Sequence, residues 1–188
     1  MDRKNLYSKF LEFVPEELIK IDEPMKKHTT FKIGGPADIL ISPCNKEQIK
    51  SILKICKENE VPFYIMGNGS NLLVRDKGFR GVIIQIYKNM SKVKITEDEV
   101  WAEAGILLSS LANRIKDESL TGFEFAAGIP GTLGGAVYMN AGAYGGEIKQ
   151  VLVSAELLDE NGNEIILTNK ELELGYRTSL LQRKNYIL

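Results

Sequence analysis

Cysteine and histidine, the usual ligands of structural metals, are scarce in this sequence. Its 188 residues contain two cysteines, Cys44 and Cys56, and one histidine, His28, which has no cysteine or second histidine close to it. Structural zinc sites need four such ligands, so we expect no metal site. We expect Cys56 to be a buried free thiol on the apolar face of a helix, which fits a reducing cytoplasm.

Long apolar runs and an excess of one charge are also missing. No stretch approaches the roughly 20 apolar residues of a membrane span, and the N-terminal "MDRKNLYSKFLEF" has no apolar run typical of a signal peptide. The net charge is −1, and lysine and arginine are spread along the chain. We therefore expect a cytoplasmic protein that neither enters a membrane nor binds nucleic acid.

Hydrophobic periodicity predicts an α+β fold that begins with a β-α-β unit. Strands are expected at 37–42, 62–66 and 81–86, and an N-terminal helical segment at 4–20 is broken at Pro15. Asn45 caps a helix in which Ile49, Ile52, Leu53 and Cys56 recur at the spacing of one helix face.

The second half of the chain alternates hairpins and helical segments. We expect a hairpin around Glu97–Glu99, a helix through 108–115, a hairpin with Asn161–Gly162 at its tip, a short helix or turn at 169–177 and the start of a strand at 185–188. A boundary between two lobes, 1–78 and 79–188, follows "NLLVRDKG". Because the last residues are apolar and nothing closes the domain, we expect a fragment of a longer protein.

A glycine-rich stretch, "GIPGTLGGAVYMNAGAYGGE", runs from Gly128 to Glu147, and seven of its twenty residues are glycine. Each glycine inside a regular element costs about 0.5–1 kcal/mol relative to alanine, so the stretch needs a compensating reason. Disorder is disfavoured because apolar and aromatic residues interrupt the glycines. The stretch therefore predicts a backbone that passes close to a bound ligand.

A second small-residue loop, "GNGSN", occupies 67–71 directly after a predicted strand. Such a loop is either an ordinary turn or a nest of backbone N–H groups that binds phosphate oxygens. The dinucleotide fingerprint is excluded because Leu72 stands where its third glycine is required, and no P-loop motif is present. Two such loops, sixty residues apart, indicate a pyrophosphate held from two sides.

Four motifs follow one another along the chain: "TTFKIGGPAD", "MGNGSNLLV", "EFAAGIPGTLGGAVYMNAGAYGGE" and "YRTSLLQ". Together they resemble the UDP-N-acetylenolpyruvoylglucosamine reductase family in its shorter form. The resemblance implies a two-lobed FAD-binding domain of the PCMH or vanillyl-alcohol-oxidase type, non-covalent FAD, NADPH as reductant and a UDP-sugar substrate of peptidoglycan precursor synthesis. It also implies a third, C-terminal substrate domain that this chain lacks.

The same resemblance assigns the cofactor-binding residues. They are Gly67, Asn68, Gly69, Ser70, Asn71 and Leu72 in the first loop, and Gly128, Pro130, Gly131, Thr132, Gly134, Gly135, Ala136, Asn140, Ala141 and Gly142 in the second.

Arg177 matches the catalytic arginine of the family. Hydride addition to an enol ether develops negative charge next to a carboxylate, which a fixed guanidinium stabilises. Tyr176 either binds substrate beside Arg177 or supports the turn.

Other polar and aromatic residues near the motifs receive simpler interpretations. We expect Tyr144 to pack in the core or loop, and Arg75 and Glu147 to be solvated charges. Thr29 and Thr30 are weaker candidates for cofactor contact.

The serine general acid of the family lies in its third domain, and Ser179 is too close to Arg177 to replace it. We therefore expect the chain to bind FAD but not to complete the reduction unaided. Two alternatives stay open: another FAD oxidoreductase of the same fold, in which His28 is the only histidine available for covalent flavin attachment, and a non-catalytic FAD-binding module.

Overall fold

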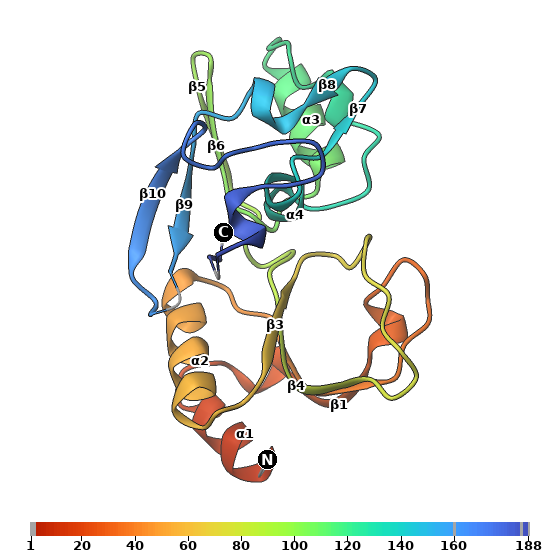
Figure 1. Ribbon diagram of the computed structural model, residues 1–188, viewed down its shortest axis with the longest axis vertical. Coiled ribbons are helices and arrows are strands. Elements are labelled where there is room, and N and C mark those ends of the chain that lie inside the picture. Colours follow the sequence, from red (N-terminus) through yellow and green to blue (C-terminus); the bar gives the residue numbers. More distant parts are fainter. Residues whose placement is uncertain (1–2, 160, 185, 188) are drawn as a thin grey trace. The chain divides into compact units, whose positions relative to one another are not determined.

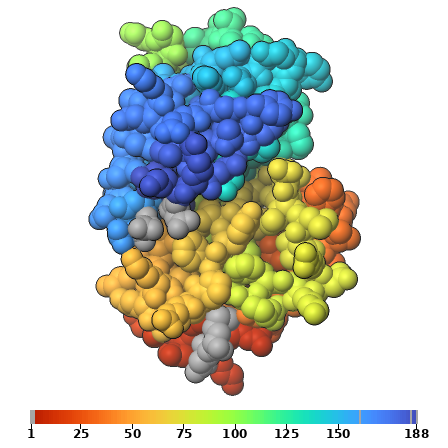
Figure 2. Space-filling view, viewed as in Figure 1, coloured from red at the N-terminus to blue at the C-terminus, as the bar shows by residue number. Residues whose placement is uncertain are grey.

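The computed structural model describes residues 3–159, 161–184 and 186–187. The chain divides into two compact units, Met1–Met90 and Ser91–Leu188. The first unit is coloured red to yellow-green in Figures 1 and 2, and the second green to blue.

A four-stranded sheet organises the first unit, in the order β1-β2-β4-β3. Its strands are β1 (Ile19–Pro24), β2 (Pro36–Ile41), β3 (Phe63–Met66) and β4 (Phe79–Gln85). β4 pairs in parallel with β2 and β3, and β1 adds an antiparallel edge. Residues 37–41 of β2 are all buried, as expected for a strand covered on both faces.

Two helices accompany this sheet, α1 (Arg3–Leu11) and α2 (Lys46–Glu58) (Figure 1). Asn45 caps α2 as the sequence predicted, since its side chain accepts a hydrogen bond from the Gln48 N–H at 2.9 Å. The predicted apolar face is also confirmed, because Ile49, Ile52, Leu53 and Cys56 are buried. Burial raises the pKa of the Cys56 thiol to about 12.

The N-terminal segment differs in part from the prediction of a helical segment at 4–20 that is broken at Pro15. α1 ends at Leu11, a short 3-10 helix covers Glu16–Leu18, and β1 begins at Ile19. Pro15 lacks an N–H and cannot continue the helix, and the residues after it pair with β2 instead.

The boundary between the units also differs from the expected one after residue 78. A break there would separate β4 from both of the strands that flank it. The compact division falls twelve residues later, between Met90 and Ser91, because β4 lies inside the first sheet.

The second unit is built from hairpins and short helices. It contains β5 (Val93–Thr96), β6 (Glu99–Ala102), α3 (Leu108–Asp117), 3-10 helices at Glu124–Ala126, Ile148–Gln150 and Leu180–Gln182, α4 (Leu133–Tyr138), β7 (Gly142–Ala143), β8 (Gly146–Glu147), β9 (Ser154–Leu158) and β10 (Glu164–Thr168). Its core joins α3 and α4 to β9, with Leu108, Val137 and Leu172 almost fully buried.

Both predicted hairpins are confirmed, as β5–β6 and β9–β10. The 169–177 segment forms turns rather than a helix. Of the expected strand at 185–188, residues 185 and 188 lie outside the described part, and Ile187 forms a single bridge with Leu158.

The middle of the glycine-rich stretch forms α4, a helix that the sequence did not predict. No helix in the described ranges is both long and apolar enough to cross a bilayer. Nor do three or more acidic, histidine or cysteine side chains gather there as ligands for a metal ion.

Candidate cofactor-binding site

The first predicted loop, Gly67–Leu72, leaves β3 at the carboxyl end of a parallel pair of strands. Its start is fixed by the neighbouring strand β4, since the Gln85 amide donates to the Gly67 carbonyl at 3.3 Å and the Ile86 N–H donates to the Met66 carbonyl at 2.8 Å. Ligands of α/β sheets bind outside this end of the strands. The strand register therefore places the loop where a cofactor is expected.

Gly69 sets the conformation of this loop. Its φ is +70°, and a Cβ built on it would overlap the backbone carbonyl of His28. The Gly69 carbonyl in turn accepts a hydrogen bond from the Thr30 N–H at 3.2 Å. Only glycine combines this backbone angle with this close approach.

Several N–H groups of the loop are available to a ligand. Within the described residues, the backbone N–H groups of Asn68, Gly69 and Ser70 donate to no protein acceptor. Consecutive unpaired N–H groups bind phosphate oxygens. The loop therefore fits one end of a pyrophosphate, and the assignment of these residues to FAD remains a prediction.

A depression of about 420 Å3 lies beside the loop and carries two lysines. Its lining residues are Lys27, His28, Thr29, Thr30, Asn68, Gln85, Tyr87 and Lys88. Thr30 is exposed, whereas Thr29 is buried and donates its hydroxyl to the Ile33 carbonyl at 3.1 Å. Thr30 thus keeps its side chain for a ligand, and Thr29 serves the protein backbone. Sequence reasoning missed Lys27, Gln85 and Lys88, because no motif marks them.

In the second predicted stretch, only some of the backbone N–H groups are available to a ligand. The N–H groups of Gly128, Gly131 and Thr132 have no protein acceptor in the described part of the chain. Those of Gly134 and Ala136 donate to the carbonyls of Ala104 and Thr132, at 2.8 and 2.9 Å.

The Gly135 N–H also has a protein acceptor, because it donates to the Thr132 hydroxyl at 3.5 Å. Pro130 has no N–H to offer. The start of the stretch is therefore better suited to a ligand than the helix that follows it.

Asn140 was predicted to bind the cofactor, but the structure uses its side chain inside the protein. It is 2% exposed and has a φ of +44°. Its amide donates to Glu147 at 2.9 Å and to the Gly175 carbonyl at 3.0 Å, and its oxygen accepts from the Lys149 N–H at 2.9 Å. Asn140 is thus a structural junction whose two amide N–H donors are both used within the protein.

Glu147 belongs to the same junction and is not the solvated charge that the sequence predicted. Besides accepting from Asn140, its side chain forms a reciprocal capping box with Gln150. Ala141 is buried and its N–H donates to Ala136 at 2.8 Å. Gly142 offers its carbonyl to Arg177.

Arg177 lies at the tip of a tight turn whose two ends, Gly175 and Thr178, exchange backbone hydrogen bonds. Its φ is +55°, unusual for a residue with a side chain, and its guanidinium donates to the Gly142 carbonyl at 3.1 Å. The guanidinium also lies 5.6 Å from the centre of the Tyr176 ring, which is 89% exposed. The turn presents both side chains to solvent, and the guanidinium contacts the Gly142 carbonyl and the Tyr176 ring.

One hydroxyl group and one side-chain amide connect this turn to the end of α4. Ser179 is fully buried and donates to the Tyr138 carbonyl at 2.5 Å, and Gln182 donates to the same carbonyl at 3.1 Å. The Ser179 hydroxyl is thus occupied by a structural contact, which agrees with its exclusion as a general acid.

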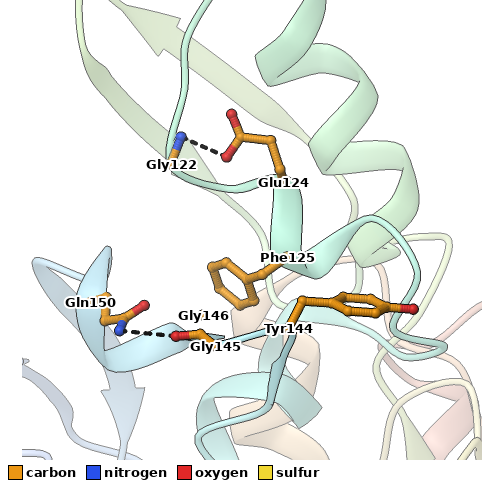
Figure 3. A pocket seen from close by; sticks show the side chains of 7 residues that line it. All are labelled: Gly122, Glu124, Phe125, Tyr144, Gly145, Gly146 and Gln150. Atoms are coloured by element: carbon orange, nitrogen blue, oxygen red, sulfur yellow. Dashed lines mark hydrogen bonds between the residues drawn. The ribbon is translucent and has the colours of Figure 1, made fainter.

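Tyr144 does not pack in the core or in its loop, contrary to the prediction, because it is 98% exposed. It has a φ of +53° and rims an open depression of about 490 Å3 (Figure 3). The other lining residues are Gly122, Glu124, Phe125, Gly145, Gly146 and Gln150. In this depression the Glu124 carboxylate accepts from the Gly122 N–H at 2.8 Å.

The sheet, the loop after β3 and the N–H groups of Asn68, Gly69 and Ser70 are features that proteins with a phosphate-bearing cofactor share. The family model described as "FAD binding domain" matches residues 37–168. The chain therefore belongs to the FAD-binding domain family, and the predicted cofactor class and fold are confirmed.

Curated relatives match the whole chain. The chain is 56% identical over 187 residues to the UDP-N-acetylenolpyruvoylglucosamine reductase of Alkaliphilus oremlandii. It is 48% identical over the same length to the protein of that name from Clostridioides difficile. The chain spans 62% of the length of each of these relatives. The resemblance read from the four motifs is thereby confirmed.

Solved structures agree with the fold. The UDP-N-acetylenolpyruvylglucosamine reductase of Thermus caldophilus is similar with a TM-score of 0.75 and 33% identity, over 90% of this chain and 59% of that one. An alkyldihydroxyacetonephosphate synthase, with a TM-score of 0.67 and 21% identity over 88% of this chain and 35% of that one, shares the fold alone.

Proposed function

We propose that the chain is the FAD-binding part of a UDP-N-acetylenolpyruvoylglucosamine reductase. The full reaction is the NADPH-dependent reduction of that UDP-sugar to UDP-N-acetylmuramate in peptidoglycan precursor synthesis. The observation that carries the proposal is the 48–56% identity to relatives of that name along the whole chain. Both the cytoplasm as compartment and the UDP-sugar and NADPH as partners follow from the same proposal.

FAD supplies the chemistry of the reaction when bound, because it accepts a hydride from NADPH and passes it to the enolpyruvyl double bond. We assign the unpaired N–H groups of Asn68, Gly69 and Ser70 to one side of its pyrophosphate. We assign those of Gly128, Gly131 and Thr132 to further cofactor oxygens. A Cβ built on Gly128 meets no atom within 4 Å, which leaves space for a ligand there.

Arg177 is the residue that we assign to the substrate carboxylate. Its guanidinium is exposed to solvent, and the Gly142 carbonyl and the Tyr176 ring both contact it and restrict its orientation. Arginine binds carboxylates through two parallel N–H groups and stabilises negative charge that develops beside them. Tyr176 supports the orientation of the guanidinium.

A flavin linked covalently to His28 is disfavoured by the hydrogen bonds of that residue. Both ring nitrogens already have partners, Glu23 at 2.9 Å and Gln85 at 3.2 Å, and the side chain is 13% exposed. We therefore assign FAD as a non-covalent cofactor.

Substrate binding to the FAD-loaded chain tests the role of Arg177. We expect Arg177→Gln to weaken binding of the UDP-enolpyruvyl substrate by about 10- to 100-fold, since a charged hydrogen bond contributes about 1.5–3 kcal/mol. Titration calorimetry measures this, and Arg114→Gln, which removes an exposed arginine from α3, is the matched control. Equal affinities for the two variants would contradict the assignment.

Reduction of the bound flavin tests the proposed reductant. NADPH should bleach the flavin absorbance of the FAD-loaded chain under anaerobic conditions. A bound flavin that NADPH leaves fully oxidised would contradict this part of the proposal.

A further inference from the structure

A series of hydrogen bonds, called the hydrogen-bond chain below, ends at the first residue of the Gly67–Leu72 loop. The Glu23 carboxylate lies 2.9 Å from His28 Nε2, and His28 Nδ1 lies 3.2 Å from the Gln85 amide oxygen. The Gln85 amide nitrogen donates to the Gly67 carbonyl at 3.3 Å. The hydrogen-bond chain connects a carboxylate on β1 to the first carbonyl of the loop, through one imidazole and one amide.

The chemistry of the end groups fixes the protons along the hydrogen-bond chain. The Gly67 carbonyl only accepts, so the Gln85 atom that faces it must be the amide nitrogen. The amide oxygen of Gln85 therefore faces His28 Nδ1, and this ring nitrogen must carry a proton.

Glu23 fixes the proton on the other ring nitrogen. Burial alone would raise the pKa of its carboxyl, but the hydrogen bond with His28 and the charges of Lys20 and Lys27 outweigh burial and lower it. The lysine nitrogens lie 3.8 and 3.6 Å from the carboxylate. An ionised carboxylate only accepts, so His28 Nε2 donates to it, and both ring nitrogens are donors.

The backbone of His28 meets the same loop. Its carbonyl oxygen occupies the space that a Cβ on Gly69 would need, and the Thr30 N–H holds the Gly69 carbonyl at 3.2 Å. The loop is therefore held at Gly67 through the His28 side chain and at Gly69 through the His28 backbone and Thr30. Within the described residues, the N–H groups of Asn68, Gly69 and Ser70 are those that donate to no protein acceptor.

We propose that His28 is a positioning residue which, as an imidazolium between Glu23 and Gln85, sets the Gly67–Leu72 loop for the FAD pyrophosphate and makes FAD affinity fall as pH rises. The proposal rests on the proposed function of the loop.

Loss of one imidazole proton must break one contact of the hydrogen-bond chain. If the neutral ring keeps its N–H toward Glu23, the lone pair of His28 Nδ1 faces the Gln85 oxygen. If the Gln85 amide then rotates, its oxygen faces the Gly67 carbonyl instead. Either arrangement sets two acceptors against each other. The other titratable groups around the ring are Lys20 and Glu23 on β1, Lys27 on the preceding 3-10 helix, and Tyr87 and Lys88 in the same depression. Lysine and tyrosine titrate at higher pH than an ordinary histidine.

Because His28 is the sole histidine, nuclear magnetic resonance reports its ring without overlap. The experiment follows the ring nitrogens and the backbone amides of Asn68 and Gly69 in the FAD-free chain across the pH interval in which the ring loses its proton. We expect the loop amides to shift in step with the ring. A ring that loses its proton while the loop amides stay unchanged would overturn the proposal.

FAD affinity over the same pH interval supplies the second measurement. We expect the dissociation constant to rise roughly fivefold as the ring loses its proton, the equivalent of one hydrogen bond. His28→Gln should remove this step, and Lys26→Gln, which takes an exposed charge from the same 3-10 helix, should keep it.

The outcomes separate the two proposals. If the loop amides shift with the His28 ring but the protein takes up no FAD at any pH, the FAD assignment of the loop is overturned. The hydrogen bonds that link Glu23 to Gly67 through His28 and Gln85 would still be supported. FAD binding whose affinity is flat across the titration of the ring would overturn the role of His28. If His28→Gln does not fold, the titration of the unchanged chain decides alone.

Discussion

At the scale of single residues, Asn140 shows how one side chain holds three segments of the second unit. It joins the end of α4 to Glu147, to Lys149 and to Gly175, at the base of the turn that presents Arg177. The side chain itself is 2% exposed, and each of its three hydrogen bonds contributes to stability. The side chain thereby supports Arg177 from a distance.

Replacing Asn140 with alanine should lower the free energy of unfolding by about 2–4 kcal/mol, because it removes the three hydrogen bonds of a buried side chain. Thermal and denaturant unfolding measure the loss. Asn113→Ala, on the exposed face of α3, should change stability by less than about 0.5 kcal/mol. Similar losses in both variants would show that the junction contributes no special stability.

Two glycines distinguish a conformational requirement from ligand contact. Gly69→Ala introduces a clash with His28 at a φ of +70°, so it should reduce both the melting temperature and FAD affinity. Gly128→Ala places its methyl group in open space, so it should leave the melting temperature unchanged and weaken only FAD binding. Unaltered FAD affinity in Gly128→Ala would remove this residue from the assigned site.

At the scale of elements, α4 is the feature that sequence reasoning missed. Gly134 and Gly135 occupy two of its first three positions, and glycine is a poor helix former. Tertiary contacts supply what propensity lacks, since the N–H groups of Leu133 and Gly134 donate to Ile106 and Ala104 at 2.8 Å. These partners lie far away in sequence, so no local pattern indicates them.

By contrast, α2 was predictable because its cap and its apolar face are local features. Asn45 and the buried positions Ile49, Ile52 and Cys56 behave as the spacing predicted. The same reasoning placed the loop after β3 correctly. It did not predict the interior contacts of Asn140 and Glu147, because these depend on which segments the fold brings together.

The burial of Cys56 on α2 predicts the chemistry of both thiols. With its pKa raised to about 12, Cys56 stays a thiol at neutral pH and should resist alkylation. Cys44 is half-buried and should react faster. Mass spectrometry after brief labelling should find one modified cysteine in the folded chain and two after unfolding. Rapid labelling of Cys56 in the folded chain would contradict its burial in α2.

The tip of the β9–β10 hairpin predicts an acid-dependent contribution to stability. Hydrogen bonds from the Asn163 side chain and backbone, with those from Asn161 and Gly162, outweigh desolvation and lower the pKa of Asp159. A lowered pKa stabilises the folded chain above the unfolded pKa of about 3.9, and this contribution is lost as pH falls through the folded value. Asp159→Asn should therefore reduce stability at neutral pH more than at low pH, as paired thermal unfolding curves would show. An equal difference at both pH values would contradict the prediction.

At the scale of the whole molecule, the chain consists of two units with separate cores. In its described part, each unit has a loop with N–H groups that donate to no protein acceptor. The first loop follows β3 and the second precedes α4. The pairing of β4 with β2 and β3 assigns residues 79–90 to the first unit, which the sequence could not indicate because strand order is a long-range property. The central claim is that this chain binds FAD without a covalent bond.

The visible absorption spectrum of the purified chain, after addition of FAD and removal of the excess, tests that claim most directly. The account predicts a flavin spectrum that stays with the folded chain and passes into the filtrate after denaturation. A chain that retains no flavin, or one whose flavin stays attached after denaturation, would contradict it.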